Sequence, residues 1–217
     1  SEYFLYTIEG TETIPTGWSK RLKSFDIDGV PVVNLYKFEE ERHGPRVVRF
    51  LSFTNDEEHE LGETPIPDGS MRVYRSVGDR GHLSYEGQSS FKYIPVGEEV
   101  ELNLGAVPDV VVEPVLMDFK TENYRFDDDG NVSGWDDVHT IRIDARNMRD
   151  VPVKVEVRRN FDTQYWSLSR SGAVEQFEKV DLDTVEFTVE MAPRSARTFE
   201  YTVRLYRQQR IGDWRAN

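Results

Sequence analysis

The feature that most constrains the fold is the alternation of apolar and polar residues along IRIDARNMRDVPVKVEVRR, Ile141 to Arg159. Ile141, Ile143 and Ala145 fall on one side of an extended chain, because successive side chains of a β-strand point to opposite faces. After a polar corner, valines occupy every second position from Val151 to Val157. This period of two predicts two strands, each with one buried face and one face in water.

Two arrangements of these strands fit the pattern. In a hairpin that closes near residues 148–150, Arg142 would lie opposite Glu156 and Asp144 opposite Lys154. In the other arrangement, the corner carries the chain from one sheet of a sandwich to the other. In both, the charged residues form a solvated strand face and not a catalytic group.

The same alternation recurs along the chain, while no segment sustains the 3.6-residue period of a helix. Glycine and proline turns such as PDG at Pro67 and PVGE at Pro95 separate the segments. We therefore predict an all-β fold of tandem antiparallel, immunoglobulin-like β-sandwiches with very little helix. The predicted strands include VVRFLSF from Val47, SMRVYR from Ser70, EVELNL from Glu99, VEFTV from Val185 and FEYTVRL from Phe199.

A weak internal echo indicates how the strands divide. VVRFLSFTN, ending at Asn55, and HTIRIDARN, ending at Asn147, each read as a strand, an asparagine and a polar corner, and a second strand follows each. The echo predicts an N-terminal β-sandwich unit over residues 1–106 and a C-terminal immunoglobulin-like sandwich with an arginine-rich polar tail over residues 107–217. Glycine and proline near Leu104 to Asp109 mark the boundary. One continuous sandwich is the alternative.

Composition excludes several classes of function. The 217 residues carry a net charge of −13, so the average surface repels nucleic-acid phosphates and anionic bilayers, and no nucleic-acid partner is expected. No apolar run approaches the roughly 20 residues that span a bilayer, so no direct membrane insertion is expected. The absence of cysteine excludes disulfides, cysteine–zinc sites and a thiol nucleophile. The chain begins with Ser1, which we interpret as the mark of a processed or truncated product.

The sharpest local candidate for a site is DDDGNVSGWDD, residues 127–137, where oxygen ligands suited to calcium gather. Aligning Gly130 with the invariant glycine of an EF-hand loop puts Arg125 at the first ligand position, and strands flank the loop where helices belong. The favoured interpretation is a polar hairpin tip. Calcium is the one cofactor considered, with Asp127, Asp129, Asn131 and Asp136 as its candidate ligands.

Aromatic residues offer a second class of site. Trp135 and Trp166 lie among polar residues that suit a sugar-binding platform, although packing in a core or at an interface between domains is the favoured role. In the tail, Arg204, Arg207, Arg210 and Arg215 are expected to fold back onto the acidic body or to remain mobile, and docking to an anionic partner is the less favoured alternative.

Catalytic motifs are missing. There is no G-x-S-x-G elbow and no glycine-rich phosphate loop, and the four histidines are scattered. The sequence therefore assigns no catalytic residue and leans away from an enzyme.

Five segments in order carry a resemblance to a known family: GTETIPTGWSKRL, VVRFLSFTNDEEHELGETPIPDGSMRVYR, YIPVGEEVELNLG, TIRIDARNMRDVPVKVEVRR and VEFTVEMAPRSARTFEYTVRLY. Together they resemble the C-terminal domain of unknown function in bacterial mucoidy-inhibitor-like proteins, over roughly Tyr6 to Tyr206. The resemblance implies an all-β module that follows an N-terminal β domain and often a coiled-coil insertion, in proteins that are frequently exported. It implies no catalytic or binding residue.

From these observations we expect a noncatalytic interaction or structural module of a larger, envelope-associated bacterial protein, periplasmic or otherwise exported. Its partner would be another protein or the rest of the same polypeptide, with a glycan as an alternative ligand. The alternative function is a carbohydrate-binding module or a carboxylate-based glycan hydrolase acting on exopolysaccharide. An unpaired sheet edge or apolar patch would favour the interaction module, and a cleft with two converging carboxyl groups would favour the enzyme.

Overall fold

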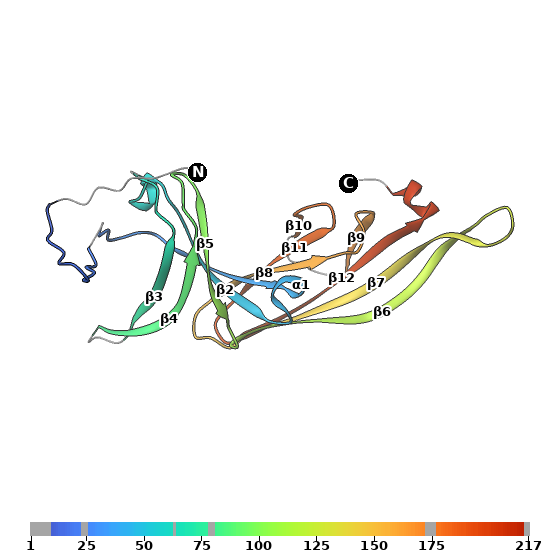
Figure 1. Cartoon of the computed structure of the whole chain (residues 1–217). Coiled ribbons are helices and arrows are strands. Elements are labelled where there is room, and N and C mark those ends of the chain that lie inside the picture. Colours follow the sequence, from blue (N-terminus) through green and yellow to red (C-terminus); the bar gives the residue numbers. More distant parts are fainter. Residues whose placement is uncertain (1–9, 23–25, 63, 78–80, 172–176, 215–217) are drawn as a thin grey trace.

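The computed structural model describes residues 10–22, 26–62, 64–77, 81–171 and 177–214. The fold is nearly all β, as predicted (Figure 1). None of the helical segments in these ranges has the length and apolar character needed to cross a membrane. The elements are β1 (Val33–Glu39), α1 (Glu40–His43), β2 (Val47–Thr54), η1 (Glu57–His59), β3 (Gly69–Val77), β4 (His82–Phe91), β5 (Glu99–Ala106), β6 (Val110–Phe126), β7 (Val132–Asn147), β8 (Val153–Asn160), β9 (Trp166–Ser171), β10 (Phe177–Lys179), β11 (Thr184–Met191), β12 (Ser195–Gln208) and η2 (Gln209–Asp213).

The strands form two sheets and a separate hairpin. The larger sheet has the order β10-β11-β8-β1-β2-β5, the smaller has the order β6-β7-β12-β9, and β3 pairs with β4 alone. All pairs are antiparallel except β1 with β8, where Tyr36 lies beside Val155 in a parallel register. This parallel pair departs from the antiparallel sheets predicted from the sequence.

The main core lies between the two sheets and is built by the alternating residues of the opening pattern. On the larger sheet, Val155 and Val157 are fully buried next to Phe187. On the smaller sheet, Ile143 and Tyr201 are fully buried. Because each fully buried aliphatic side chain contributes about 1.5–3 kcal/mol, this shared face supplies much of the stability.

The corner after Asn147 connects the sheets. β7 belongs to the smaller sheet and β8 to the larger, so the hairpin arrangement is wrong and the sheet-to-sheet corner is correct. Arg142 accordingly pairs with Asp144 of its own strand, with its Nε 3.0 Å from Oδ2. Glu156 lies within 3.4 Å of Lys37 on β1.

A second, smaller core lies at the other end of the larger sheet. Val47, at the start of β2, belongs to the main core, whereas Leu51 and Phe53 of the same strand belong to the small core with Leu102 of β5. The larger sheet thus contains strands from both predicted units, and its β5 ends at the predicted boundary. The division of the chain into units over residues 1–106 and 107–217 stays a prediction.

The two asparagines of the sequence echo perform the same task at the two corners. Asn55 is 1 % exposed and Asn147 is 2 % exposed. Each side-chain amide donates to carbonyls of the turn, from Asn55 to Ile94 and Pro95 and from Asn147 to Val151 and Ala192. Each side-chain oxygen accepts a backbone N–H, from Gly62 or from Arg149. One buried side chain therefore replaces the missing ladder bonds at each corner.

Replacing Asn147 with alanine should destabilise the protein by about 3 kcal/mol, because it leaves two carbonyls and one N–H of the corner unsatisfied. Urea unfolding measures the change. The control is Asn34→Ala, which removes one surface contact with Arg49 and should cost no more than about 0.5 kcal/mol. Equal effects of the two substitutions would contradict this role for Asn147.

Candidate functional site

The most distinctive feature of the surface is the long hairpin of β6 and β7, which projects from the sandwich (Figure 1). We call residues 116–140 the arm. β7 of the arm pairs with β12 along its length, and η2 folds onto it beside Gly134. A Cβ at Gly134 would lie 2.9 Å from the backbone nitrogen of Arg210, so glycine is needed for this close approach.

A buried carboxylate fastens the outer face of the arm. The side chain of Asp136 on β7 is 0 % exposed. It accepts hydrogen bonds from Arg204 Nη1 at 2.7 Å, from Arg210 Nε at 2.9 Å and from Asn123 Nδ2 at 2.8 Å. The cluster continues to Glu122, whose Oε1 lies 2.7 Å from Arg204 Nη2. The cluster therefore joins β6, β7, β12 and η2.

Burial and the surrounding hydrogen bonds together determine the pKa of Asp136. Burial is the largest influence and by itself would raise the pKa. The hydrogen bonds from Arg210, Asn123 and Arg204 together outweigh it, so the pKa lies below its ordinary value of 3.8. Asp136 is thus held as a carboxylate by cations and is not poised to exchange a proton near neutral pH.

The arginine-rich tail behaves as predicted for its described members. Arg204 and Arg210 bind Asp136, and Arg207 Nε donates to Asp137 at 2.8 Å. Arg207 also reaches Asp162 at 3.0 Å. Arg215 lies outside the described residues.

The four calcium candidates do not come together. Asp127, Asp129 and Asn131 lie at the tip of the arm, where Asp127 Oδ1 accepts the backbone N–H groups of the other two. Asp136 lies apart from them, within its arginine cluster. Within the described ranges, no group of three or more histidine or acidic side chains has a geometry that could hold a metal ion.

The two tryptophans proposed as a sugar platform lie in different settings. Trp166 is 8 % exposed and belongs to the main core, and its Nε1 donates to the carbonyl of Leu182. Trp135 lies half-buried on β7, and its Nε1 donates to Asp137 Oδ1 at 3.0 Å. Trp166 therefore contributes to the core, and Trp135 alone of the pair remains accessible on the arm.

The sequence reasoning missed the edge of the arm. β6 is the terminal strand of the smaller sheet, and none of the described strands pairs with its outer edge. Halfway along it, Leu116 is 59 % exposed, Met117 46 % and Phe119 54 %. The available signal was the run VVVEPVLMDF, but its apolar residues do not alternate, and a bulge at Met117 interrupts the pairing with β7.

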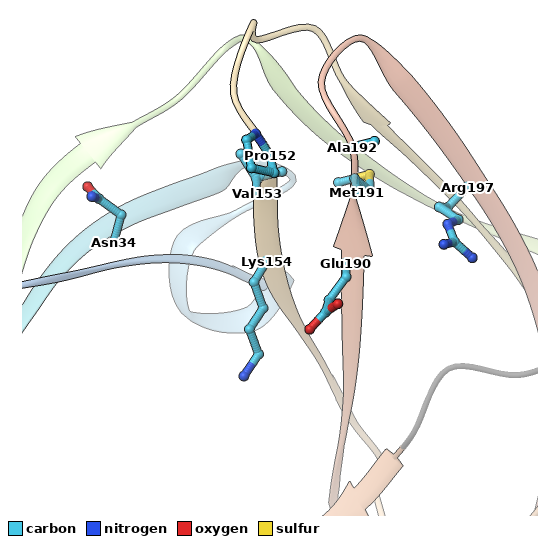
Figure 2. Close-up of a pocket in the computed structure, with 8 residues that line it drawn as sticks. All are labelled: Asn34, Pro152, Val153, Lys154, Glu190, Met191, Ala192 and Arg197. Atoms are coloured by element: carbon cyan, nitrogen blue, oxygen red, sulfur yellow. The ribbon is translucent and has the colours of Figure 1, made fainter.

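A shallow depression of about 500 Å³ lies at the corner end of the larger sheet (Figure 2). Val153 and Met191 are its buried residues, and Lys154 and Glu190 lie side by side over neighbouring strands, flanked by Asn34 and Arg197. Glu190 is the one carboxylate of this lining. A glycosidase of the usual kind needs two, so the depression does not support hydrolysis.

Comparisons of the chain with protein-family models, curated proteins and solved structures find no match. Any function therefore has to be inferred from the geometry of the chain itself.

Substituting Asp136 with alanine should cost about 3 kcal/mol of unfolding free energy, because Arg204, Arg210 and Asn123 would lose the buried carboxylate that accepts a hydrogen bond from each of them. Chemical denaturation measures the loss. Asp128→Ala is the matched control, since this aspartate lies exposed at the arm tip, and it should change stability by less than about 0.5 kcal/mol. A comparable loss in both variants would refute the role assigned to Asp136.

The carboxylate of Asp136 should also make the free energy of unfolding depend on pH in the acid range. Since its folded pKa lies below 3.8, the folded state binds this proton more weakly than the unfolded chain does. Its contribution is therefore present above pH 3.8 and is lost as the pH falls through the folded pKa. The difference in unfolding free energy between the wild type and Asp136→Asn should shrink from about pH 6 to about pH 3.

Urea titrations at both pH values test this, because the carboxyl groups outside the Asp136 cluster titrate alike in the two proteins. Asp150 is the comparison, because a hydrogen bond from Arg194 lowers its pKa too. This carboxyl group is exposed, so Asp150→Asn should leave the pH dependence of the unfolding free energy nearly unchanged. A constant difference for Asp136→Asn across the range would contradict the prediction.

Proposed function

We propose that this protein is a noncatalytic interaction module that binds a protein chain along the outer edge of β6. The observation that carries the proposal is the exposure of Leu116, Met117 and Phe119 on a strand edge to which no described strand is paired. Such an edge offers backbone hydrogen bonds to an added strand, and its apolar side chains offer the area that a partner buries.

The edge strand β5 of the larger sheet gives a useful contrast with β6. On β5, Val100 and Leu102 point into the small core, and they alternate with the exposed residues Glu99, Glu101 and Asn103. Charged and polar residues of this kind discourage association at an edge. The middle of β6 differs, because it exposes the apolar side chains of Leu116, Met117 and Phe119 beside the charges of Asp118 and Lys120, which supports a role in binding.

The hydrogen bonds that hold the arm in place also favour binding at its edge. The Asp136 cluster ties β6 to β7, β12 and η2 through charge-assisted hydrogen bonds. A rigid edge loses little conformational entropy when a partner strand is added. The stiff arm thus presents the edge ready for pairing.

The wider setting of this function rests on the resemblance to the domain of mucoidy-inhibitor-like proteins. We propose that the chain serves within a larger, exported bacterial protein and that the partner is another protein or a further part of the same polypeptide. Carbohydrate binding is the second candidate, favoured by the exposed aromatic side chains Phe119, Tyr124 and Phe126 of β6.

Site-specific photo-crosslinking in native cells tests the proposal. A photoreactive phenylalanine analogue at Phe119 should form a covalent adduct with a discrete protein species, visible as a shifted band and identified by mass spectrometry. The control is the same analogue at Leu83, which is 70 % exposed on β4, away from the arm. An absence of adducts at Phe119, or identical adducts at both positions, would refute protein binding at this edge.

A further inference from the structure

We infer that the strand that pairs with the β6 edge is β6 of a second copy of this protein. This inference rests on the proposed function and names its partner. The two strands would run antiparallel about a two-fold axis at Phe119, so that the smaller sheets of two copies join into one continuous sheet. Closed two-fold pairing of this kind is the commonest symmetry of soluble oligomers.

Charge complementarity carries the inference. When Phe119 lies opposite its own copy in an antiparallel pair, Asp118 lies opposite Lys120, and Glu113 lies opposite Arg125. The two-fold axis makes each of these pairs occur twice. None of the described ion pairs includes Asp118. Lys120 of the second copy would therefore be its partner.

The four charged side chains share one face of the sheet. Glu113 contacts Arg146 of β7, and Arg125 contacts Asp213 of η2, which covers the outer face beside Gly134. Asp118 and Lys120 lie opposite Thr140 and Val138, on the same side of β7 as Asp136. The opposite charges of two copies would therefore meet on one surface.

The bulges of β6 limit the part of the strand over which this register stays in step. The pairing of β6 with β7 shifts between Leu116 and Asp118, between Glu122 and Arg125, and between Arg125 and Phe126. The first two shifts each leave one extra residue in β6, one on either side of Phe119. In the two-fold pair, the residues from Asp118 to Lys120 therefore match face for face, and Glu113 and Arg125 share a face again beyond the bulges.

Neighbouring registers are poorer. Centring the pair on Asp118 or on Lys120 places that charge opposite its own copy, which is repulsive. A pair centred on Thr121 sets Lys120 opposite Glu122, but it places Phe119 opposite Asn123, so the aromatic contact at the axis is lost. The register centred on Phe119 combines opposite charges with an aromatic contact at the axis.

Charge exchange tests the pairing in the full chain. Sedimentation velocity over a concentration series should show a reversible dimer of the wild type. Asp118→Lys and Lys120→Asp should each weaken the dimer by at least about tenfold, because each sets like charges opposite one another twice. A mixture of the two variants should dimerise again, since lysines at both positions then face aspartates. Leu83→Lys should leave the dimer unchanged, and thermal unfolding midpoints verify folding.

The absence of native cysteine permits an independent test. Opposed residues of an antiparallel pair lie about 4.5–5.5 Å apart, which a disulfide can bridge. Under mild oxidation, Phe119→Cys should therefore form a covalent dimer, whereas Leu83→Cys should not. Crosslinking at Thr121→Cys in place of Phe119→Cys would overturn the register.

A wild type that stays monomeric, or a dimer indifferent to the charge changes, would overturn the inference. If photo-crosslinking at Phe119 then still captured a different protein, the proposed function would survive. A failure of both experiments would remove both.

Discussion

The constraint on which the rest of the structure depends is the insertion of β1 between β8 and β2. β1 pairs in parallel with β8 and antiparallel with β2, so it closes the larger sheet across both halves of the chain. Phe38 of β1 is fully buried in the main core, and β2 continues from that core into the small one. Loss of this strand would separate the two cores and expose two inner edges at once.

Buried polar side chains determine where the chain turns and which parts are rigid. Asn55 and Asn147 satisfy the corner backbone from inside the protein, and Asp136 fastens the arm through two arginines. In the low-dielectric interior, each group is costly without its partners, which restricts the chain to the arrangement that satisfies them. The abundant aspartates of the sequence thus serve structure at Asp136 and turn formation at Asp127.

The β6 edge links this architecture to the proposed function. The Asp136 cluster ties β6 to β7, β12 and η2, and the terminal place of β6 in the smaller sheet leaves its outer edge without a described partner strand. Its exposed apolar residues lie around a bulge that interrupts the pairing with β7. The non-alternating sequence at this bulge also hid the strand from sequence reasoning.

The sequence by itself determined the all-β class, most of the strands and the corner asparagines, because period-two alternation and turn residues are local properties of the chain. Only the tertiary structure decided the parallel insertion of β1, the sheet change after Asn147, the burial of Trp166 and the exposure of Phe119. These depend on which strands meet across long separations. Alternation indicates that a face is buried, but the pairing of distant strands decides what covers it.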